Sequence, residues 1–381
     1  MKLKKILAVA LVLVMVLSFA ACTKSSSNEI VIGVSGPLTG SAAQYGNAVV
    51  NAAKLAVDEI NEAGGVNGTK LKLISADDEA DSGEKAVSAY NSLKDQGMQI
   101  FLGTVTSGSC LAVIDKTKED NMFQLTPSAS ADGVIKNDNC FQICFTDSNQ
   151  GVGSAQYIAE NKLATKVGVI YDSSDAYSSG IFNQFKKAAA DKSLEIVAEQ
   201  AFTKDSNKDF SAQVKACKEA GADLVFLPIY YTEASLVLQA AAKAEYDVKF
   251  FGCDGLDGIL AVENFDKKLA EGVMLLTPFA ADAQDKLTQD FVNSYKAKYN
   301  EVPNQFAADA YDGIYIIKAA IEKAGATPDM STEELCNAIK GAMTQITVDG
   351  VTGLGMTWTA DGEPNKAPKG MKIQNGAYVA M

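Results

Sequence analysis

The chain has 381 residues, a formal net charge of −13 at pH 7 and no histidine. The absence of histidine removes the usual general base, the Ser-His and Cys-His nucleophile pairs and the commonest metal ligand. The acidic balance argues against nucleic acid and anionic lipid surfaces as partners. We therefore expect no catalytic residues of these types, no metal, no cofactor and no nucleic-acid partner.

The first 22 residues have the order of a secretory signal. Lysines among the first five residues precede an apolar run at 6–17, and small residues follow up to Cys22. This ending resembles a bacterial lipobox, so it predicts a signal peptide at 1–21, a lipid on Cys22, a polar tether at 22–28 and anchoring on the outer face of the cell membrane. An uncleaved anchor helix is the alternative, and it is disfavoured because a span needs roughly 20 apolar residues.

After the tether, short β-rich runs alternate with helical stretches. In the first series, a capping-box pattern from Ser41 to Gln44 predicts a helix that runs toward Gly64. Strands of this series are expected at 29–34, 71–74, 100–102 and 123–125.

A second series begins after Asp147. Its strands are expected at 166–171, 194–197, 224–227 and 250–251, and its helices begin near Ala176, Lys208 and Thr232. A strand at 273–279 then leads to helices at 284–299 and 305–325, and the tail has candidate strands at 356–359 and 377–379. Repeated strand-helix-strand units imply parallel sheets covered on both faces. Two series predict an α/β protein with two doubly wound parallel-sheet lobes.

The strand-to-helix junctions are the places to look for a ligand. In open α/β sheets, ligands bind beyond the carboxyl ends of the strands, where helix N-termini offer free backbone N–H groups. Four junctions are rich in hydroxyl residues, tyrosine or acid, at 35–46, 103–109, 126–130 and 251–255. Taken singly, each has a simpler explanation. The glycines at 36–40 fit no phosphate-loop spacing, and the serines and the acid are ordinary cap and turn residues.

In this order, over essentially the whole mature chain, the segments resemble the leucine/isoleucine/valine-type solute-binding proteins of ABC import systems. The resemblance is carried by 32–40, Tyr45-Gly46, 58–61 with Gly64-Gly65, 126–129, 311–313 before 319–325, and Thr352-Gly353 with Gly362. It implies a type I periplasmic-binding-protein-like fold, whose lobes close around a three-crossing hinge. It places lobe 1 at 29–147 plus about 279–349, lobe 2 at 148–278 plus about 350–381, and the crossings at 146–149, 277–279 and 348–351.

The resemblance also implies the ligand, a free amino acid, branched-chain or related, that is delivered to ABC permease subunits. In the family, hydroxyls and backbone N–H groups of the first lobe hold the ligand carboxylate. The matching positions are Ser107 and Ser130, with the backbone at Ser128. An acid of the second lobe meets the ligand ammonium, and Asp254 occupies that position. A helix N-terminus can stabilise a carboxylate without an arginine.

Tyrosines match the pocket aromatics of the family. They are Tyr45, Tyr177 and Tyr231, with Tyr230 as a close competitor for the last position. Walls of this kind recognise a side chain by area and shape, so single-methylene discrimination should be modest. The hydroxyl groups make the pocket somewhat polar for a strictly aliphatic ligand.

Two other functions fit parts of the sequence. The same fold could serve as an amino-acid or amide sensing domain that docks to a receptor. An exported hydrolase could use the densest acidic cluster, at 77–79 and Asp81, but these acids follow a strand and are typical of a solvated turn. The transport hypothesis, without enzymatic activity, accounts for the leader and for all four junctions.

Overall fold

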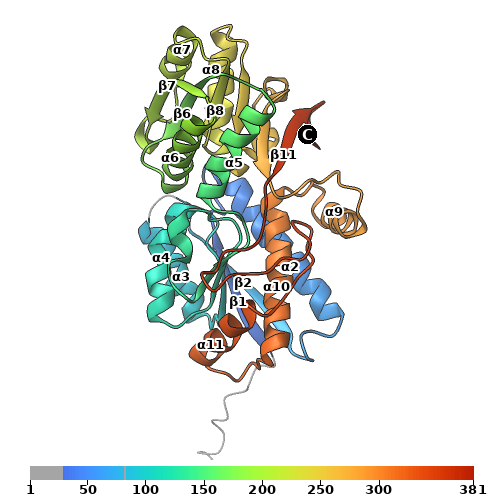
Figure 1. The fold of residues 1–381 in the computed structure, drawn as a ribbon. Helices are drawn as coiled ribbons and strands as arrows, with labels where there is room; N and C mark the ends of the chain where they lie inside the picture. The colour runs from blue at the N-terminus through green and yellow to red at the C-terminus, as the bar shows by residue number, and fades with distance from the viewer. Residues whose placement is uncertain (1–28, 81–82) are drawn as a thin grey trace, which may run out of the picture.

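A computed structural model describes residues 29–80 and 83–381 of the protein. The expected signal peptide, Cys22 and the tether lie outside the described residues. Figure 1 shows two α/β lobes, and the orange and red C-terminal part of the chain runs along both. Across the described ranges, no helix is long and apolar enough to cross a membrane. The predicted α/β class with two parallel-sheet lobes is confirmed.

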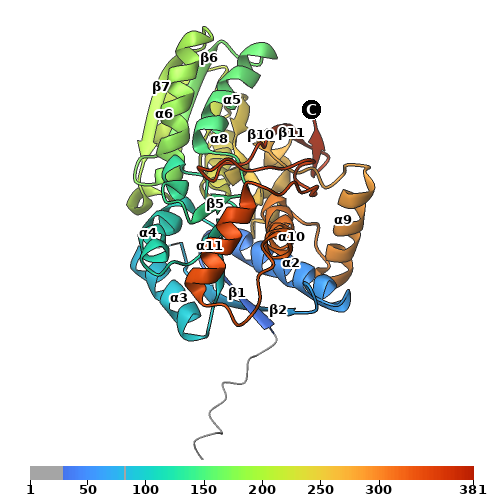
Figure 2. The same cartoon turned by 60° about the horizontal axis from the view of Figure 1, so that its bottom comes forward.

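Lobe 1 is built on a parallel sheet that, within the described residues, has five strands. In spatial order they are β2 (Lys70–Asp77), β1 (Glu29–Gly36), β3 (Ile100–Gly103), β4 (Gln124–Thr126) and β5 (Cys140–Gln142). Its helices are α2 (Ala43–Glu62), α3 (Gly83–Asp95), α4 (Ser107–Glu119), α9 (Lys286–Tyr299), α10 (Gln305–Ala324) and α11 (Thr332–Met343). Helices α2, α10 and α11 pack together, and α3 packs with α4 on the other side of the sheet (Figure 2). All of β1 after Glu29 is buried, as expected for a sheet covered on both faces.

Lobe 2 has a mixed sheet. In spatial order its strands are β7 (Glu195–Phe202), β6 (Lys166–Asp172), β8 (Leu224–Leu227), β9 (Lys249–Gly252), β10 (Met274–Thr277), β11 (Lys369–Gln374) and β12 (Ala377–Ala380). Its helices are α5 (Asp147–Glu160), α6 (Ala176–Asp191), α7 (Ser211–Glu219) and α8 (Tyr231–Lys243). The first five strands are parallel, but β11 and β12 add an antiparallel hairpin at the edge. Asn375 and Gly376, both with positive φ, form its two-residue turn.

The chain crosses between the lobes three times, and the third crossing differs from the sequence prediction. The first lies between β5 and α5, and the second follows β10. The third was expected at 348–351, but the chain stays on lobe 1 well beyond that point. The Trp358 indole N–H donates to the Gln142 carbonyl at 2.8 Å, and the Gln142 N–H donates to the Gly362 carbonyl at 3.1 Å. The crossing therefore lies between Lys366 and β11, and no regular strand forms at 356–359.

A second correction concerns the start of α2. The predicted capping box does not form, because α2 begins at Ala43 and its N-cap, Ala42, makes no side-chain cap hydrogen bond. The Ser41 carbonyl instead accepts a hydrogen bond from Thr232 Oγ1 of lobe 2 at 2.8 Å. The segment before α2 is therefore positioned by the opposite lobe.

A buried ion pair ties the third crossing to α10. Lys366 Nζ lies 2.9 Å from Asp309 Oδ1, and both side chains are almost fully buried, with exposed fractions of 1% and 2%. Lys366 Nζ also donates to Thr352 Oγ1 at 2.6 Å. Asp312 accepts from the backbone N–H groups of Val351 and Thr352 at 2.9 Å each. Burial raises the pKa of Asp309 to about 6, and the Lys366 charge opposes that rise.

We expect Lys366→Met to destabilise the protein by about 3 kcal/mol, because it would leave two neighbouring buried acids, Asp309 and Asp312, without a cation. Urea titration followed by circular dichroism measures the free energy of unfolding. Lys340→Met is the matched control, because the ion pair of Lys340 with Asp138 lies at the surface and should contribute less than about 1 kcal/mol. Equal losses in the two variants would contradict this role for Lys366.

Candidate functional site

The carboxyl ends of strands from both lobes face each other across the interlobe interface. Strands β3 and β4 lead to Ser107 and Ser128 in lobe 1, and β8 and β9 lead to Tyr230 and Asp254 in lobe 2. The ends of parallel strands gather at one edge of each sheet. The parallel topology of each lobe therefore brings together junctions that are far apart in the sequence.

A small cavity of about 10 Å³ lies between these junctions. Six of the predicted site residues line it, together with Val105, Thr106, Gly255 and Phe306; the six are Tyr45, Ser107, Ser128, Tyr177, Tyr230 and Asp254. The volume corresponds to about one water molecule. An amino acid therefore enters only if the lobes separate or the aromatic side chains move.

The two predicted serines that line the cavity have fixed positions. Ser107 is the first residue of α4, whose N-cap residue, Thr106, makes no side-chain cap hydrogen bond. Ser107 Oγ accepts from the N–H groups of Ser130 and Ala131 at 3.1 Å each. Ser128 Oγ donates to the Val105 carbonyl at 2.7 Å. A helix N-terminus flanked by hydroxyls suits a carboxylate.

Ser130 was predicted to hold the carboxylate together with Ser107, but it does not line the cavity. Its side chain is fully buried, and its Oγ donates to Asp147 Oδ1 at 2.7 Å. Asp147 is the first residue of α5 and lies within the first crossing. The structure therefore places Ser130 at the hinge, where it bonds to Asp147 in the first crossing.

Asp254 is a buried acid whose hydrogen-bond partners are uncharged. Its side chain is 4% exposed, and Tyr177 Oη donates to its Oδ1 at 2.7 Å. The same hydroxyl accepts from the Gly255 N–H at 2.9 Å. No lysine of the described residues forms an ion pair with Asp254. Burial raises the pKa of Asp254 to about 7, the Asp309 charge adds to the rise, and hydrogen bonds from Tyr177 and Gln150 oppose it.

Aromatic rings form the remaining wall. Tyr45 stacks on Phe306 with ring centroids 4.0 Å apart, and Tyr177 stacks on Tyr230 at 4.9 Å. Tyr230 lines the cavity, whereas Tyr231 stands behind Tyr45 in an edge contact at 4.9 Å. Of the two tyrosines predicted for the same aromatic position, Tyr230 therefore lines the cavity and Tyr231 supports Tyr45. Sequence reasoning missed Phe306, because it follows no strand end and lies at the start of α10.

Two buried glutamines, also missed from sequence, hold the main chain of Asp254. Its N–H donates to Gln150 Oε1 at 3.1 Å, and its carbonyl accepts from Gln305 Nε2 at 2.7 Å. The Gln305 N–H donates to Asp257 Oδ2 at 2.8 Å, and its Oε1 accepts from Thr277 Oγ1 at 3.0 Å. Because Gln305 begins α10 of lobe 1, its hydrogen bonds to Asp254 and Asp257 form across the closed interface.

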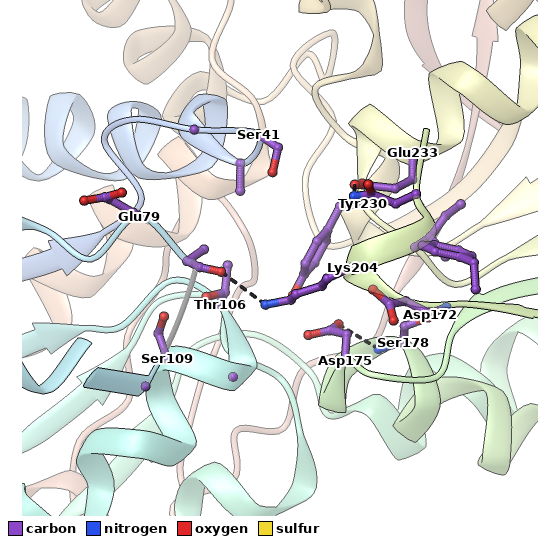
Figure 3. A pocket seen from close by; sticks show the side chains of 18 residues that line it. Ser41, Glu79, Thr106, Ser109, Asp172, Asp175, Ser178, Lys204, Tyr230 and Glu233 are labelled. Atoms are coloured by element: carbon purple, nitrogen blue, oxygen red, sulfur yellow. Dashed lines mark hydrogen bonds between the residues drawn. The ribbon is translucent and has the colours of Figure 1, made fainter. Parts of the chain in front are cut away.

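A larger cavity of about 430 Å³ adjoins the small one, and the two share Thr106 and Tyr230 (Figure 3). We call the larger cavity the vestibule; its polar lining comes from both lobes and includes Ser41, Glu79, Thr106, Ser109, Asp172, Asp175, Ser178, Lys204, Asn207, Tyr230 and Glu233.

The acidic cluster that suggested a hydrolase has a structural role where it is described. Asp77 accepts from Thr39 Oγ1 at 2.6 Å and from the Leu38 N–H at 2.8 Å. Asp78 is fully buried and accepts from Ser35 Oγ at 3.0 Å. These acids fasten the turn after β1 to the end of β2, while Asp81 lies outside the described residues.

A closed cleft between two α/β lobes, with polar groups at the strand ends of both, is the arrangement of a solute-binding protein. A model of the periplasmic binding protein family matches residues 29–377, and the chain belongs to that family of extracytoplasmic solute-binding proteins.

Named relatives agree with this assignment. The chain is 30% identical over 313 residues to a leucine-, isoleucine-, valine-, threonine- and alanine-binding protein of Pseudomonas aeruginosa, covering 81% of this chain and 83% of the relative. It is 34% identical over 306 residues to a Leu/Ile/Val-binding protein homologue of Brucella melitensis, covering 79% and 81%. The structure of the branched-chain amino acid transporter substrate-binding protein LivJ from Streptococcus pneumoniae, in complex with isoleucine, matches with a TM-score of 0.84 at 30% identity, covering 92% and 98%.

We expect Gln305→Ala to shift the lobes toward an open arrangement, because it removes the amide that donates across the interface to the Asp254 carbonyl. The radius of gyration from small-angle X-ray scattering should rise relative to the wild type. Gln99→Ala is the matched control, since Gln99 bonds to Val31 and Pro328 within lobe 1. An unchanged radius in Gln305→Ala, or an equal rise in both variants, would contradict a closing role for Gln305.

Proposed function

We propose that the protein captures a free amino acid, branched-chain or related, between its lobes and delivers it to the permease of an ABC importer. The observation that carries the proposal is the position of Asp254. A buried acid without a cationic partner among the described residues faces a helix N-terminus and two serines across a small cavity. An α-amino acid presents one ammonium and one carboxylate a short distance apart. The names of the relatives support this class of ligand.

In the proposed complex, Ser107, Ser128 and the first turn of α4 hold the ligand carboxylate. This revises the sequence prediction for Ser130, which bonds to Asp147 instead. The Asp254 carboxylate accepts hydrogen bonds from the ligand ammonium, and the hydrogen bond from Tyr177 keeps the Asp254 carboxylate oriented. Charge-assisted hydrogen bonds of this kind are about twice as strong as neutral ones. They would hold the headgroup common to all amino acids.

The ligand side chain would contact the aromatic wall. Tyr45, Phe306 and Tyr230 line the cavity, and Tyr231 supports Tyr45 from behind. An apolar wall separates side chains that differ by one methylene by only about 1–3 kcal/mol. A protein with this wall should accept several related amino acids. We assign the site to binding and delivery, with no catalytic step.

Lobe closure would couple binding to delivery. We assign 29–147 and about 279–366 to lobe 1, and 148–278 and about 367–381 to lobe 2, with the third boundary moved to agree with the contacts of Trp358 and Lys366. Because the ligand would contact both lobes, its binding favours the closed arrangement by the difference in affinity between the two states. A permease can then distinguish loaded from unloaded protein by shape.

A lipid anchor on Cys22 would place this cycle at the membrane. We propose that the signal peptide at 1–21 is removed, that Cys22 is acylated, and that the tether at 22–28 holds the lobes at the outer face. Tethering keeps the loaded protein at a high effective concentration beside its permease. The proposal rests on the order of basic, apolar and small residues before Cys22.

We expect binding of leucine, isoleucine or valine to weaken as the pH falls below about 7. The ligand ammonium needs the ionised form of Asp254, whose pKa in the free protein is raised to about 7 by burial. At pH 6 most of the Asp254 carboxyl groups are protonated, and each must lose its proton before the ligand binds. Affinity at pH 6 should therefore be about tenfold below that at pH 8.

Isothermal titration calorimetry across this range measures both affinity and pH dependence. Asp254→Asn should bind far more weakly and lose the pH dependence, because it keeps the shape of the side chain without the charge. Binding by the variant that equals the wild type would contradict the role of Asp254. Absence of heat with every amino acid tested would contradict the proposed function itself.

We expect Cys22→Ser to release the protein from cell membranes, because serine offers no thiol for the lipid. Immunoblots of membrane and soluble fractions give the distribution, and mass spectrometry of the wild type should show an acylated N-terminal cysteine. Cys336→Ser is the matched control, because Cys336 is buried in the core of lobe 1. Membrane association of Cys22→Ser at the wild-type level would contradict the anchor.

A further inference from the structure

The vestibule adjoins the proposed headgroup site. Its volume of about 430 Å³ falls within the range of small-molecule sites. It meets the small cavity at Thr106 and Tyr230, so a ligand held between Ser107 and Asp254 has this opening on one side. A straight side chain that leaves the headgroup past the Tyr230 ring would enter the vestibule.

The walls of the vestibule do not suit an aliphatic group. Phe202, Ile229 and two alanines are the apolar side chains in a lining that is otherwise polar or glycine. Small-molecule sites usually have mostly apolar walls with a few polar groups. Figure 3 shows Asp172, Asp175 and Glu233 on the lobe 2 side of this space, whereas Glu79 lies at its lobe 1 edge and pairs with Lys85. The chemistry of the space is therefore acidic.

Asp172 and Asp175 are the most deeply buried of the acids that line the vestibule. Their exposed fractions are 9% and 8%. Asp172 ends β6, and its Oδ1 accepts from the Ser174 N–H at 2.8 Å and from Ser174 Oγ at 2.6 Å. Its Oδ2 accepts no hydrogen bond from any described residue. Asp175 caps α6, with Oδ2 accepting from the Ser178 N–H at 3.1 Å.

Burial and neighbouring acids raise the pKa of two of the lining residues, Asp175 and Glu233. Burial raises the pKa of Asp175 to about 6, and the Asp172 charge adds to the rise. Burial also raises the pKa of Glu233, and Asp172 and Asp175 contribute. Lys204, the one basic residue among the described lining residues, opposes the rise at Asp175. Its Nζ donates across the interface to the Ala80 carbonyl at 3.4 Å. Glu79 is paired with Lys85, so among the described lining residues Lys204 accompanies the three acids of lobe 2.

We propose that the vestibule receives a cationic group at the end of the ligand side chain, with Asp172 and Asp175 as its principal partners. The protein would then bind an α-amino acid that ends in an ammonium or guanidinium group more tightly than its uncharged analogue. Tyr230, at the entrance, would add a cation–π contact. This inference rests on the proposed function, because the headgroup must occupy the site at Asp254.

Lysine and norleucine form the test pair, because norleucine is lysine without the terminal ammonium. Calorimetry at pH 8 gives the affinity of the purified protein for each. We expect lysine to bind at least tenfold more tightly than norleucine, and the double variant Asp172→Asn with Asp175→Asn to reduce this preference at least tenfold. Asparagine keeps the hydrogen bonds to Ser174 and Ser178, since it caps helices as well as aspartate does.

The double variant Asp115→Asn with Asp290→Asn is the control for net charge, because both acids lie at the surface in exposed pairs with Lys136 and Lys286. It should leave the preference for lysine as in the wild type. Norleucine or leucine binding without a preference for lysine would overturn the vestibule proposal and leave the proposed function intact. A preference for lysine that survives in the double variant would also overturn it. Failure of every amino acid to bind would contradict the proposed function and this inference together.

Discussion

The burial of one carboxylate, that of Asp254, is the constraint on which the site depends. An ionised carboxylate removed from water is costly unless a cation or several hydrogen bonds compensate. Here hydrogen bonds from Tyr177 and Gln150 compensate only in part, and the pKa rises to about 7. The fold thus holds an acid that favours the arrival of a positive charge. A ligand ammonium is such a charge, and in the proposed complex it would reach this carboxylate through the interlobe cavity, which Asp254 lines.

Contacts at and near the hinge connect the site around Asp254 to both lobes. Gln305 joins α10 of lobe 1 to the main chain of Asp254, and Ser130 joins lobe 1 to Asp147 at the start of α5. The third crossing is tied to lobe 1 through Lys366. Charge compensation at the cavity and closure of the lobes therefore involve the same few residues. In the proposed function, ligand recognition and change of shape would be parts of one event.

Much of this arrangement could be predicted from the sequence, for identifiable reasons. Buried parallel strands appear as short apolar runs, and strand-end logic indicated both Ser107 and Asp254. The same logic could not find Phe306 or Gln305, because they enter the site from the N-terminus of α10, far along the chain and after no strand. The region around Trp358 resembled a strand because aromatic and β-branched residues alternate there. Its contacts with lobe 1, which sequence alone does not show, moved the third crossing.

The central claim is that Asp254 is a buried acid that a ligand ammonium compensates. The most direct test is the pKa of its carboxyl group. The chemical shift of the carboxyl carbon, followed by NMR as a function of pH on protein labelled at aspartate, measures this pKa, and Asp254→Asn assigns the signal. The account predicts a pKa of about 7 in the free protein and a clear decrease when leucine, isoleucine or valine saturates the site. A pKa in the ordinary range of an exposed aspartate that does not change on ligand binding would contradict it.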